Sequence, residues 1–351
     1  MFKIIFILCT IFSITYATTC INNFNNKVCK NFKVLPSVII KTTLNKKQLL
    51  EKLDKPLKQI AFLEDSNLFL VEVKDSLTYA KELEKKDFII YAQPNILQQK
   101  VKNSFKATNI VSDFNLKKLW KNTKGEGVNI AIIDDGFDLV HEDLKGVNVL
   151  FSYDSDNKNL NSSPKLKIDN HGTQVAGIIF AQHNSVGVNG IAPEANLIAI
   201  RQTTNTTSDT IISFTVSKKA GADIINCSWN SPVLLEPIYD VIKSISKDTA
   251  VVFAAGNDSR KIESFSTEAS IPEVITIGTN KKYSNYGDVV DTILPTNIKT
   301  TKINNNYGNF GGTSASAPLF SGLLALKISQ NPNEKIETLI INLKKELNGR
   351  Y

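Results

Sequence analysis

Four polar residues that lie far apart in the chain could together carry out acyl transfer. Asp134 ends the run IAIID, His171 begins HGTQVAGII, Asn257 ends AAGN, and Ser314 lies within GGTSASAP. A serine hydroxyl can attack a carbonyl carbon when a histidine takes its proton and a carboxylate orients that histidine. Asn257 and the Ser314 backbone N–H could hold the oxyanion that results.

Each of these residues also has an ordinary structural interpretation. An Asp at a strand end or a His before Gly-Thr can cap a helix, AAGN can be a turn, and GGTSASAP can start the apolar helix that follows. Spacing does not show that the four residues converge. Their order, Asp then His then Ser, nevertheless differs from the chymotrypsin and lipase orders and is that of the subtilisin arrangement.

The motifs resemble those of the subtilase family, the subtilisin-like serine endopeptidases. IIDDGFDLVHEDL is similar to the family's aspartate motif, HGTQVAGII to its histidine motif, GTSASAP to its serine motif, and DIINCSW and AAGN to its cleft segments. The resemblance runs from about residue 120 to 325. It implies a triad of Asp134, His171 and Ser314, an oxyanion hole at Asn257, and polypeptide substrates. A catalytically idle binding protein is the weaker alternative, since all four positions are filled.

The resemblance also implies which residues bind substrate. They are Ser228, Trp229, Asn230, Ala254, Ala255 and Gly256. Asn230 stands where the family usually has glycine, and SFSTEAS replaces its Tyr-Pro-Ala. Trp229 could stack on substrate or pack internally. Glu268 could favour a basic residue before the scissile bond or simply be exposed. Asp135 is expected to face the pocket or solvent, and substrate preference stays open.

The stretch AQHNSVGVNGIAP resembles the family's calcium loop. The resemblance implies Ca²⁺ ligands from the side chains of Asp143 and Asn184 and the carbonyls of Gln182, Val186 and Val188. Oxygen ligands of this kind suit Ca²⁺. The alternative is a glycine-rich turn that needs no metal, and the chemistry itself requires no cofactor.

Short apolar runs alternate with helix-like stretches from residue 128 onward. The runs GVNIAIIDD, ANLIAIR, ADIINCS, AVVFAAGN and EVITIGT each end at a polar residue or glycine. This pattern predicts an α/β domain with a mainly parallel central sheet covered on both faces, and places the polar residues at its carboxyl edge. With the resemblance, residues 117–351 become a three-layer subtilisin-like catalytic domain. No G-x-G-x-x-G follows any strand, which argues against a dinucleotide enzyme.

Residues 36–97 predict a separate small α+β unit. VIIK, NLFLVEV and FIIYA are strand-like, whereas LNKKQLLEKLD and YAKELEKK have helical spacing. The resemblance implies a ferredoxin-like propeptide that assists folding and blocks the cleft until it is cleaved. A permanent accessory domain is the alternative. Residues 98–116 then form a linker, with self-processing within 98–106.

The first 17 residues, MFKIIFILCTIFSITYA, predict a secretory signal peptide. The apolar run is short for a membrane anchor. We therefore expect export to a periplasm, the cell surface or the medium, and no membrane span after cleavage. In the polar segment 18–35, Cys20 and Cys29 could form a disulfide after export. Cys227 is expected to be a buried small hydrophobe.

The formal charge of +7 is concentrated near the N-terminus. Residues 18–106 contain 16 lysines and nine acidic residues, whereas residues 107–351 contain 24 basic and 25 acidic residues. The larger part shows no basic stripe interleaved with aromatic residues, which argues against nucleic-acid binding. A basic prosegment beside a near-neutral enzyme suits a complex that forms readily and can separate.

Overall fold

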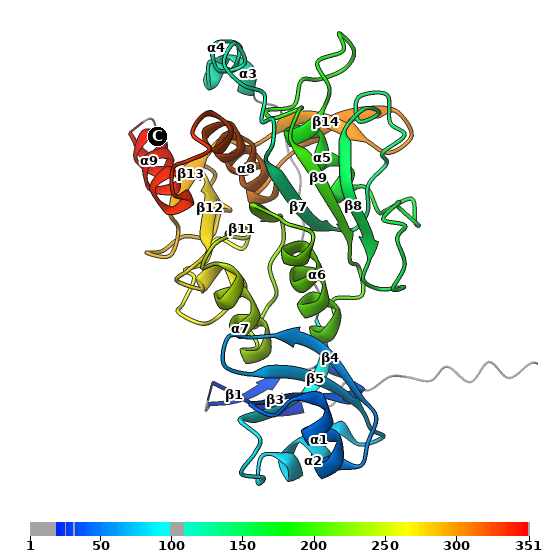
Figure 1. Ribbon diagram of the computed structural model, residues 1–351. Coiled ribbons are helices and arrows are strands. Elements are labelled where there is room, and N and C mark those ends of the chain that lie inside the picture. The colour runs from blue at the N-terminus through cyan, green and yellow to red at the C-terminus, as the bar shows by residue number, and fades with distance from the viewer. Residues whose placement is uncertain (1–18, 25, 31, 99–108, 350–351) are drawn as a thin grey trace, which may run out of the picture.

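The computed structural model describes residues 19–24, 26–30, 32–98 and 109–349. The predicted signal peptide lies outside these residues, as does the predicted processing region beyond Gln98. Figure 1 shows a small α+β part, drawn in blue, below a larger α/β part.

A parallel sheet of seven strands forms the centre of the larger part. Its order is β13-β12-β11-β10-β7-β9-β8, and every neighbouring pair is parallel. The strands are β7 Asn129–Asp134, β8 Asn148–Asp154, β9 Asn196–Arg201, β10 Ile224–Cys227, β11 Ala250–Ala254, β12 Ile275–Thr279 and β13 Thr292–Leu294. The inner strands are buried on both faces, which explains their near-continuous apolar runs.

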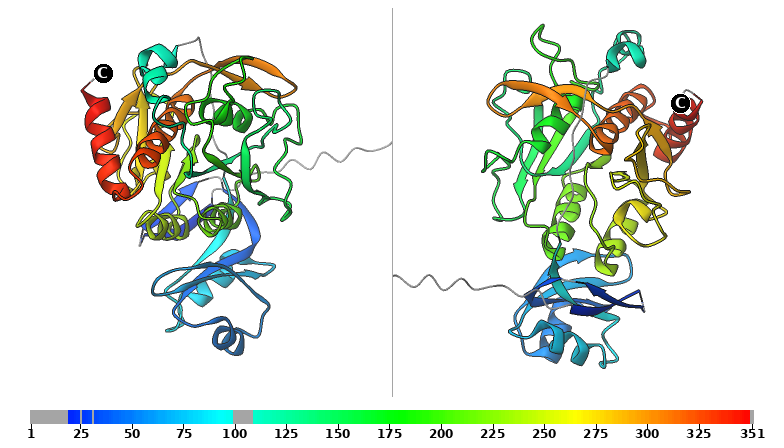
Figure 2. Two further views of the ribbon diagram at one scale, coloured as in Figure 1. Left: turned by 45° about the horizontal axis from the view of Figure 1, so that its top comes forward. Right: turned by 180° about the vertical axis from the view of Figure 1, so that it is seen from behind.

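Helices cover both faces of this sheet (Figures 1 and 2). One face carries α5 His171–Phe180, α8 Thr313–Gln330 and α9 Ile336–Asn348, and the other carries α6 Thr207–Lys219 and α7 Glu236–Ile245. Successive strand residues point to opposite faces, so Ile132 joins the core under α5 and α8 while Ile133 joins the core under α6 and α7. The predicted three-layer fold is confirmed.

The remaining short elements of the larger part connect these layers. They are α3 Ile110–Asp113, α4 Leu116–Leu119, the 3₁₀ turn η1 Glu268–Ser270, and an antiparallel hairpin of β14 Ile298–Lys302 and β15 Asn306–Phe310. This hairpin leads directly into α8.

The order of strands along the chain reverses at β7. Strands β9 and β8 lie on one side of β7, and β10 to β13 lie on the other. The loops that leave the carboxyl ends of β7 and β10 therefore diverge and open a crevice, as is general for sheets of this kind. Asp134, the last residue of β7, stands at that crevice.

The small part contains the predicted ferredoxin-like sheet. It runs β3 Lys33–Thr42, α1 Lys46–Leu53, β4 Leu57–Phe62, β5 Asn67–Glu72, α2 Ser76–Leu83 and β6 Tyr91–Leu97. The four strands are antiparallel in the order β4-β5-β3-β6. The sequence analysis missed β4, an edge strand whose alternation is broken by a register shift between Gln59 and Ala61.

A disulfide-closed hairpin precedes this sheet. Its strands are β1 Thr19–Asn23 and β2 Asn26–Lys30, and Cys20 is bonded to Cys29. Cys227 is buried in β10 and forms no disulfide with any described residue. Both expectations for the cysteines are confirmed.

The open face of the small sheet packs on α6 and α7 (Figures 1 and 2). Lys41 Nζ lies 2.9 Å from Asp240 Oδ2, and the Tyr91 hydroxyl donates to the same oxygen at 2.9 Å. Asn95 Nδ2 donates to Ser208 Oγ at 3.0 Å. These polar bonds accompany an apolar contact, since one hydrophobic cluster joins Ile39 and Ile96 of the small part to Ile211 and Val241 of the larger part.

The disulfide hairpin adds a second point of attachment. Asn23 Nδ2 donates to Leu234 O at 2.7 Å, and Asn23 Oδ1 accepts from Glu236 N at 2.7 Å. The Phe24 ring lies against Tyr239, with 5.3 Å between centroids. The hairpin therefore binds the start of α7 and the segment that leads into it.

The chain leaves the small part along the surface of the larger one. Leu97 forms an antiparallel bridge with Thr206, and Gln98 N donates to Asn205 O at 3.1 Å. This is the pattern of a peptide added as a strand to an exposed backbone segment.

Candidate active site

Asp134 and His171 meet at the carboxyl edge of the central sheet. Asp134 ends β7, and His171 is the first residue of α5. His171 Nδ1 lies 2.9 Å and 2.8 Å from Asp134 Oδ1 and Oδ2. A carboxylate only accepts, so Nδ1 carries the proton and Nε2 is left as the basic nitrogen.

Gly172 permits this close approach of α5 to the end of β7. A Cβ at Gly172 would lie 2.5 Å from Gly136 O and 3.0 Å from Asp134 Cβ. Any side chain there would push the start of α5 away from Asp134. Gly172 was not predicted to have a role, although it directly follows His171 in the motif HGT.

Asp135 caps the helix that carries His171. Its Oδ2 accepts from His171 N at 3.2 Å and its Oδ1 from Gly172 N at 2.8 Å. These N–H groups have no acceptor within the helix, so the carboxylate satisfies them. Asp135 is buried and lines a cavity beside Asp134. Of the two expectations for Asp135, the pocket-facing one agrees with the structure.

Ser314 does not bond His171 in this structure. Its Oγ donates to Ser228 O at 2.8 Å. His171 Nε2 is buried and has no hydrogen-bond partner among the described residues. The imidazole is held from its side by Phe310, with 4.9 Å between ring centroids. Hydrogen bonds of catalytic groups commonly tighten only when substrate binds.

Ser314 occupies the first turn of α8. Gly312 precedes the helix with φ of 74°, a conformation that favours glycine. Backbone N–H groups in a first helical turn have no acceptor within the helix, and the helix dipole is positive there. The Ser314 N–H thus occupies a position that suits a developing negative oxygen.

The Asn257 side chain is oriented by the start of the same helix. Its Oδ1 accepts from Thr313 N at 2.9 Å, so Nδ2 is the end that remains to donate. Gly256, with φ of 98°, leaves room for two amides: a Cβ there would lie 2.5 Å from Asn285 Nδ2 and 2.6 Å from Asn230 Nδ2. Sequence reasoning missed Asn285, whose Nδ2 donates to Ala255 O at 3.0 Å and braces this loop.

The predicted cleft segment 228–230 runs directly past Ser314. Ser228 supplies the carbonyl that Ser314 contacts, and Asn230 Nδ2 reaches Ala254 O at 3.5 Å. Trp229 is 1% exposed, donates from Nε1 to Ile133 O at 2.7 Å, and packs edge-on against Phe253. The structure therefore supports internal packing of Trp229 over stacking on substrate. Ala254 and Ala255 are buried at the end of β11.

Glu268 is not exposed, contrary to one of the two expectations. Its exposed fraction is 0%, and Oε2 accepts from Ser231 N at 2.8 Å. Because Glu268 lies in SFSTEAS and accepts from Ser231, its carboxylate links the two predicted walls of the cleft.

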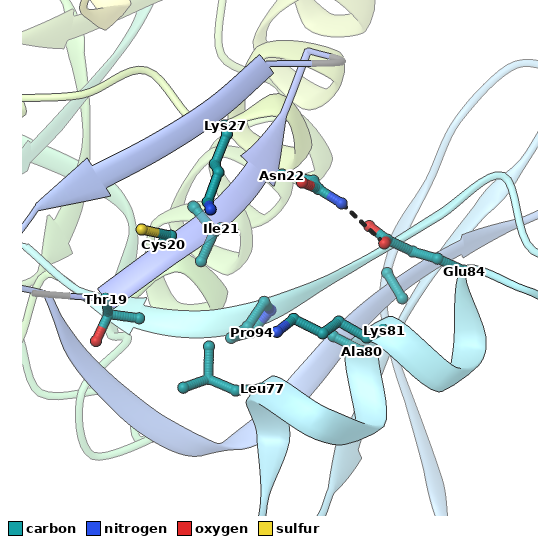
Figure 3. Close-up of a pocket in the computed structure, with 11 residues that line it drawn as sticks. Thr19, Cys20, Ile21, Asn22, Lys27, Leu77, Ala80, Lys81, Glu84 and Pro94 are labelled. Atoms are coloured by element: carbon teal, nitrogen blue, oxygen red, sulfur yellow. Dashed lines mark hydrogen bonds between the residues drawn. The ribbon is translucent and has the colours of Figure 1, made fainter.

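A large cavity in the small part contains none of the predicted catalytic residues. It measures about 600 Å³ and lies between the disulfide hairpin and α2 (Figure 3). Asn22 Nδ2 donates to Glu84 Oε2 at 3.0 Å across its wall, and Lys27 and Lys81 also line it. Cavity size alone therefore does not locate the active site of this chain.

The predicted calcium loop contains one oxygen that fits a cation. Asp143 is fully buried, and its Oδ2 accepts from Val188 N at 2.7 Å, whereas Oδ1 has no partner among the described residues. A carboxylate oxygen orphaned in this way suits Ca²⁺. Asn184 Oδ1 accepts a hydrogen bond from Val186 N at 2.9 Å, which forms a side-chain-closed turn over residues 184–186. Gln182 donates from Nε2 to Phe180 O and Pro193 O.

No group of three or more His, Cys, Asp or Glu side chains among the described residues could hold a metal ion. Within the same residues, no helix has the length and apolar character needed to cross a membrane.

Comparison with known proteins agrees with the geometry. The profile of the subtilase family matches residues 125–347. The thermophilic serine proteinase of Bacillus sp. (strain AK1) is 31% identical over 291 residues, which cover 76% of this chain and 70% of that protein. The calcium-dependent protease of Trichormus variabilis is 30% identical over 274 residues, and the match spans 41% of its length.

A solved structure shows the same fold. Fervidolysin from Fervidobacterium pennivorans, described as a keratinolytic enzyme related to subtilisin, superposes with a TM-score of 0.71 and 18% identity. The match covers 87% of this chain and 56% of that one. With a family profile that matches more than half of its residues, the chain belongs to the subtilase family, the subtilisin-like serine proteases.

Proposed function

We propose that this protein is an exported serine endopeptidase made as a self-processing zymogen, with Asp134, His171 and Ser314 as its triad. The observation that carries the proposal is the two-oxygen contact of Asp134 with His171 Nδ1. That contact leaves Nε2 basic at the crevice where β7 and β10 diverge. A catalytically idle protein would not need this orientation.

The chemistry follows from these positions. Ser314 Oγ attacks the carbonyl carbon of the peptide bond, and its proton passes to His171 Nε2. The electron pair of the carbonyl moves to oxygen, which Asn257 Nδ2 and the Ser314 N–H stabilise. Collapse breaks the C–N bond, and His171 returns the proton to the leaving amine. Water then repeats the sequence on the acyl-enzyme and restores Ser314.

Residues 36–97 act in this proposal as a propeptide. Support comes from the tail at Leu97 and Gln98, which pairs with Thr206 and Asn205 in the manner of a bound peptide. The lysine-rich charge of residues 18–106 beside a near-neutral remainder favours docking that can be reversed. Cleavage within 98–106 would separate the two parts.

Export is the remaining element of the proposal. The signal-like first 17 residues motivate it, and the Cys20–Cys29 disulfide supports it because disulfides persist in oxidising compartments. The destination is a periplasm, the cell surface or the medium.

We further propose that Asp143 contributes to a structural Ca²⁺ site, together with the side chain of Asn184 and the carbonyls of Gln182, Val186 and Val188. The buried Asp143 Oδ1 without a partner among the described residues supports it. A chelator should then lower the melting temperature of the wild type, and added Ca²⁺ should restore it. An Asp143→Asn variant should show no such response; a wild type that ignores the chelator would exclude the site.

The first experiment compares residues 18–351 as wild type and as Ser314→Ala. We expect the wild-type chain to break within 98–106 and to react with a fluorophosphonate, while the variant stays whole and unlabelled. If both chains stay whole and neither takes up the reagent, the site is idle and the binding-protein alternative gains support.

A further inference from the structure

The N-terminal hairpin, residues 19–30, depends on its disulfide because it has little core of its own. Strands β1 and β2 form a two-stranded sheet apart from the four-stranded one. A cavity of about 600 Å³ lies between this hairpin and α2 (Figure 3). Among its described residues, Ile21 is the one apolar side chain that is buried. Because an isolated two-stranded hairpin is at best marginally stable in water, the Cys20–Cys29 bond holds its shape.

The tip of this hairpin contacts the larger part of the chain. Besides the two bonds of Asn23 to Leu234 and Glu236, Phe24 N donates to Glu236 Oε2 at 3.2 Å. The Phe24 ring also lies 5.5 Å from that of Phe265, measured between centroids. The tip therefore meets both α7 and the loop before η1.

The hairpin also joins the two parts of the chain along its length. On the side of the larger part, Lys30 Nζ donates to Pro232 O at 3.0 Å. On the side of the small part, Gln93 Nε2 donates to Asn22 O at 2.8 Å and to Asn23 Oδ1 at 3.1 Å. Asn23 is thus bonded to β6 and to α7 at once. Residues 19–30 therefore form a clamp between the two parts.

The disulfide sets which side chains the clamp presents. Cys20 and Cys29 lie directly opposite each other in the β1–β2 register, as do Asn23 and Asn26 near the tip. A slip of one residue between two strands turns every side chain to the other face. The covalent bond excludes such a slip and keeps Asn23 aimed at α7. Breaking the bond allows the register to change and the contact with α7 to open.

The segment that the clamp holds is also joined to a wall of the cleft. Leu234 N donates to Ser266 O at 3.0 Å, and Ser231 N donates to Glu268 Oε2 at 2.8 Å. Ser266 and Glu268 belong to SFSTEAS, the predicted far wall. The clamp is therefore connected to this wall through Leu234, as well as to the small part.

The disulfide is accessible to a reductant. Cys29 is exposed and Cys20 is half-buried, whereas Cys227, the one other cysteine in residues 18–351, is buried. One thiolate of a dithiol attacks a cysteine sulfur, breaks the S–S bond and forms a mixed disulfide, which the second thiol then resolves. The dithiol is oxidised to a disulfide, and the two cysteine sulfurs gain two electrons and two protons.

We propose that the clamp is a redox-controlled device that holds the prosegment. It is closed while Cys20 and Cys29 are bonded, and reduction by a dithiol opens it and speeds release of the small part from the catalytic part. The inference deepens the proposed zymogen function and rests on it. The switch changes packing at one point, the contact of Asn23 with α7, and its consequence is a shorter lag before peptidase activity.

The direct test measures hydrogen exchange at the Glu236 backbone N–H in the Ser314→Ala chain of residues 18–351. That N–H lies in the first turn of α7, where no helical acceptor exists, and Asn23 Oδ1 accepts from it. We expect exchange to become about tenfold faster once a dithiol has reduced the disulfide, because the local contact then opens. Exchange at Ile225, in the central strand β10, should stay the same.

Three variants give matched controls for this measurement. Asn23→Ala removes the acceptor and should make exchange at Glu236 fast in both redox states. Lys27→Ala changes a hairpin residue that lines the cavity toward α2, and should keep both the slow exchange of the oxidised chain and its response to the dithiol. The double variant Cys20→Ser and Cys29→Ser should exchange fast and ignore the dithiol.

The functional test measures the lag before peptidase activity in the chain that retains Ser314. A dithiol should shorten this lag a few-fold in the wild type and leave it unchanged in the double cysteine variant. Processed enzyme from which the small part has been removed lacks the clamp, so its kcat/KM should not respond to the dithiol.

The outcomes distinguish the two proposals. Equal exchange at Glu236 before and after reduction overturns the clamp, whether or not the enzyme is active. Faster exchange with an unchanged lag also overturns it, because the contact then does not control release. Failure of the endopeptidase function looks different: no peptide is cleaved and no fluorophosphonate is taken up in either redox state, and exchange at Glu236 still decides whether the clamp opens.

Discussion

Two contacts of this chain are built in different ways. The first is the active-site edge, the carboxyl edge of the central sheet that carries Asp134, His171 and Ser314. There the catalytic side chains are buried, and Gly172 has no room for a Cβ, so the positions of these side chains are fixed. At the docking face, where the small sheet meets α6 and α7, polar pairs such as Lys41 and Asp240 accompany an apolar contact that belongs to one hydrophobic cluster.

The difference teaches which contact is made to last. Packing around the catalytic groups tolerates little displacement, whereas the polar pairs at the docking face can be exchanged for water once the apolar contact beside them opens. The first kind suits a catalytic arrangement, and the second suits an inhibitor that must leave. Three variants test this comparison, and a fourth at Glu126 gives a reference away from both contacts.

The largest effect is expected at the active-site edge. Gly172→Ala places a Cβ against Gly136 O and should displace α5, lowering kcat/KM by about 100-fold, since a 1 Å misplacement has that cost. Gly349→Ala is the control, because its φ is −79° and its nearest neighbour would lie 3.6 Å away. Peptidase assays measure both. Full activity of Gly172→Ala would show that the edge is not rigid.

A smaller effect is expected at the docking face. Asp240→Ala removes the acceptor of both Lys41 and Tyr91 and should weaken docking about tenfold, as for loss of a part-buried charged contact. Its readout is a shorter lag before peptidase activity appears. Asp248→Ala breaks only the exposed pair with Lys218 and should not change the lag. An unchanged lag for Asp240→Ala would mean that this face does not govern release.

Loss of the disulfide should act on the same face more weakly. The double change Cys20→Ser and Cys29→Ser frees a loop with a sequence separation of nine, which costs the hairpin about 2–3 kcal/mol in the chain-entropy account. The hairpin would then hold Leu234 and Glu236 less firmly, and the lag should shorten a few-fold. The same lag in oxidised wild type and in the double variant would contradict this role.

The smallest effect lies away from both contacts, at Glu126. Burial acts to raise the pKa of Glu126, but hydrogen bonds from the Thr123 hydroxyl and from backbone N–H groups prevail and lower it to about 2. A lowered pKa means stability that is present above the ordinary value near 4.5 and is lost as pH falls toward 2.

Glu126→Gln should therefore lower the melting temperature by about 1–3 °C at pH 7, since the group is exposed and solvent screens it. The difference from wild type should shrink as pH falls below 4.5 and should vanish near pH 2. A thermal scan at several pH values measures this. A difference that grows in acid would show that the carboxylate does not stabilise the fold.

Several features could be predicted from the sequence because their cause is local. The apolar runs that end at Asp134 and Ala254 predict parallel strands, and parallel strands bring their carboxyl ends to one edge. The cysteines of the N-terminal hairpin are near neighbours, so their pairing could also be anticipated. The edge strand β4 was missed because its bulge removes the alternation that identifies a strand.

Other features depend on what approaches from a distant part of the chain. The role of Asp135 in capping α5 could not be predicted from the sequence, because its two hydrogen-bond partners lie 36 and 37 residues away. Glu268 would be exposed by its residue type, yet the turn it belongs to folds against Ser231. Nothing in SWN distinguished a tryptophan that binds substrate from one that packs on Phe253.

The sequence by itself determined the fold class and the order of the chemical groups, since hydrophobic periodicity and residue type act over a few neighbouring positions. Only the tertiary structure decided which groups touch: that His171 meets Asp134 and that Ser314 bonds Ser228. It also decided that Gln202 and Asn205, whose side-chain oxygens have no partner among the described residues, line one cavity. These contacts arise where separate loops converge at one edge of a sheet, and no short-range pattern records that convergence.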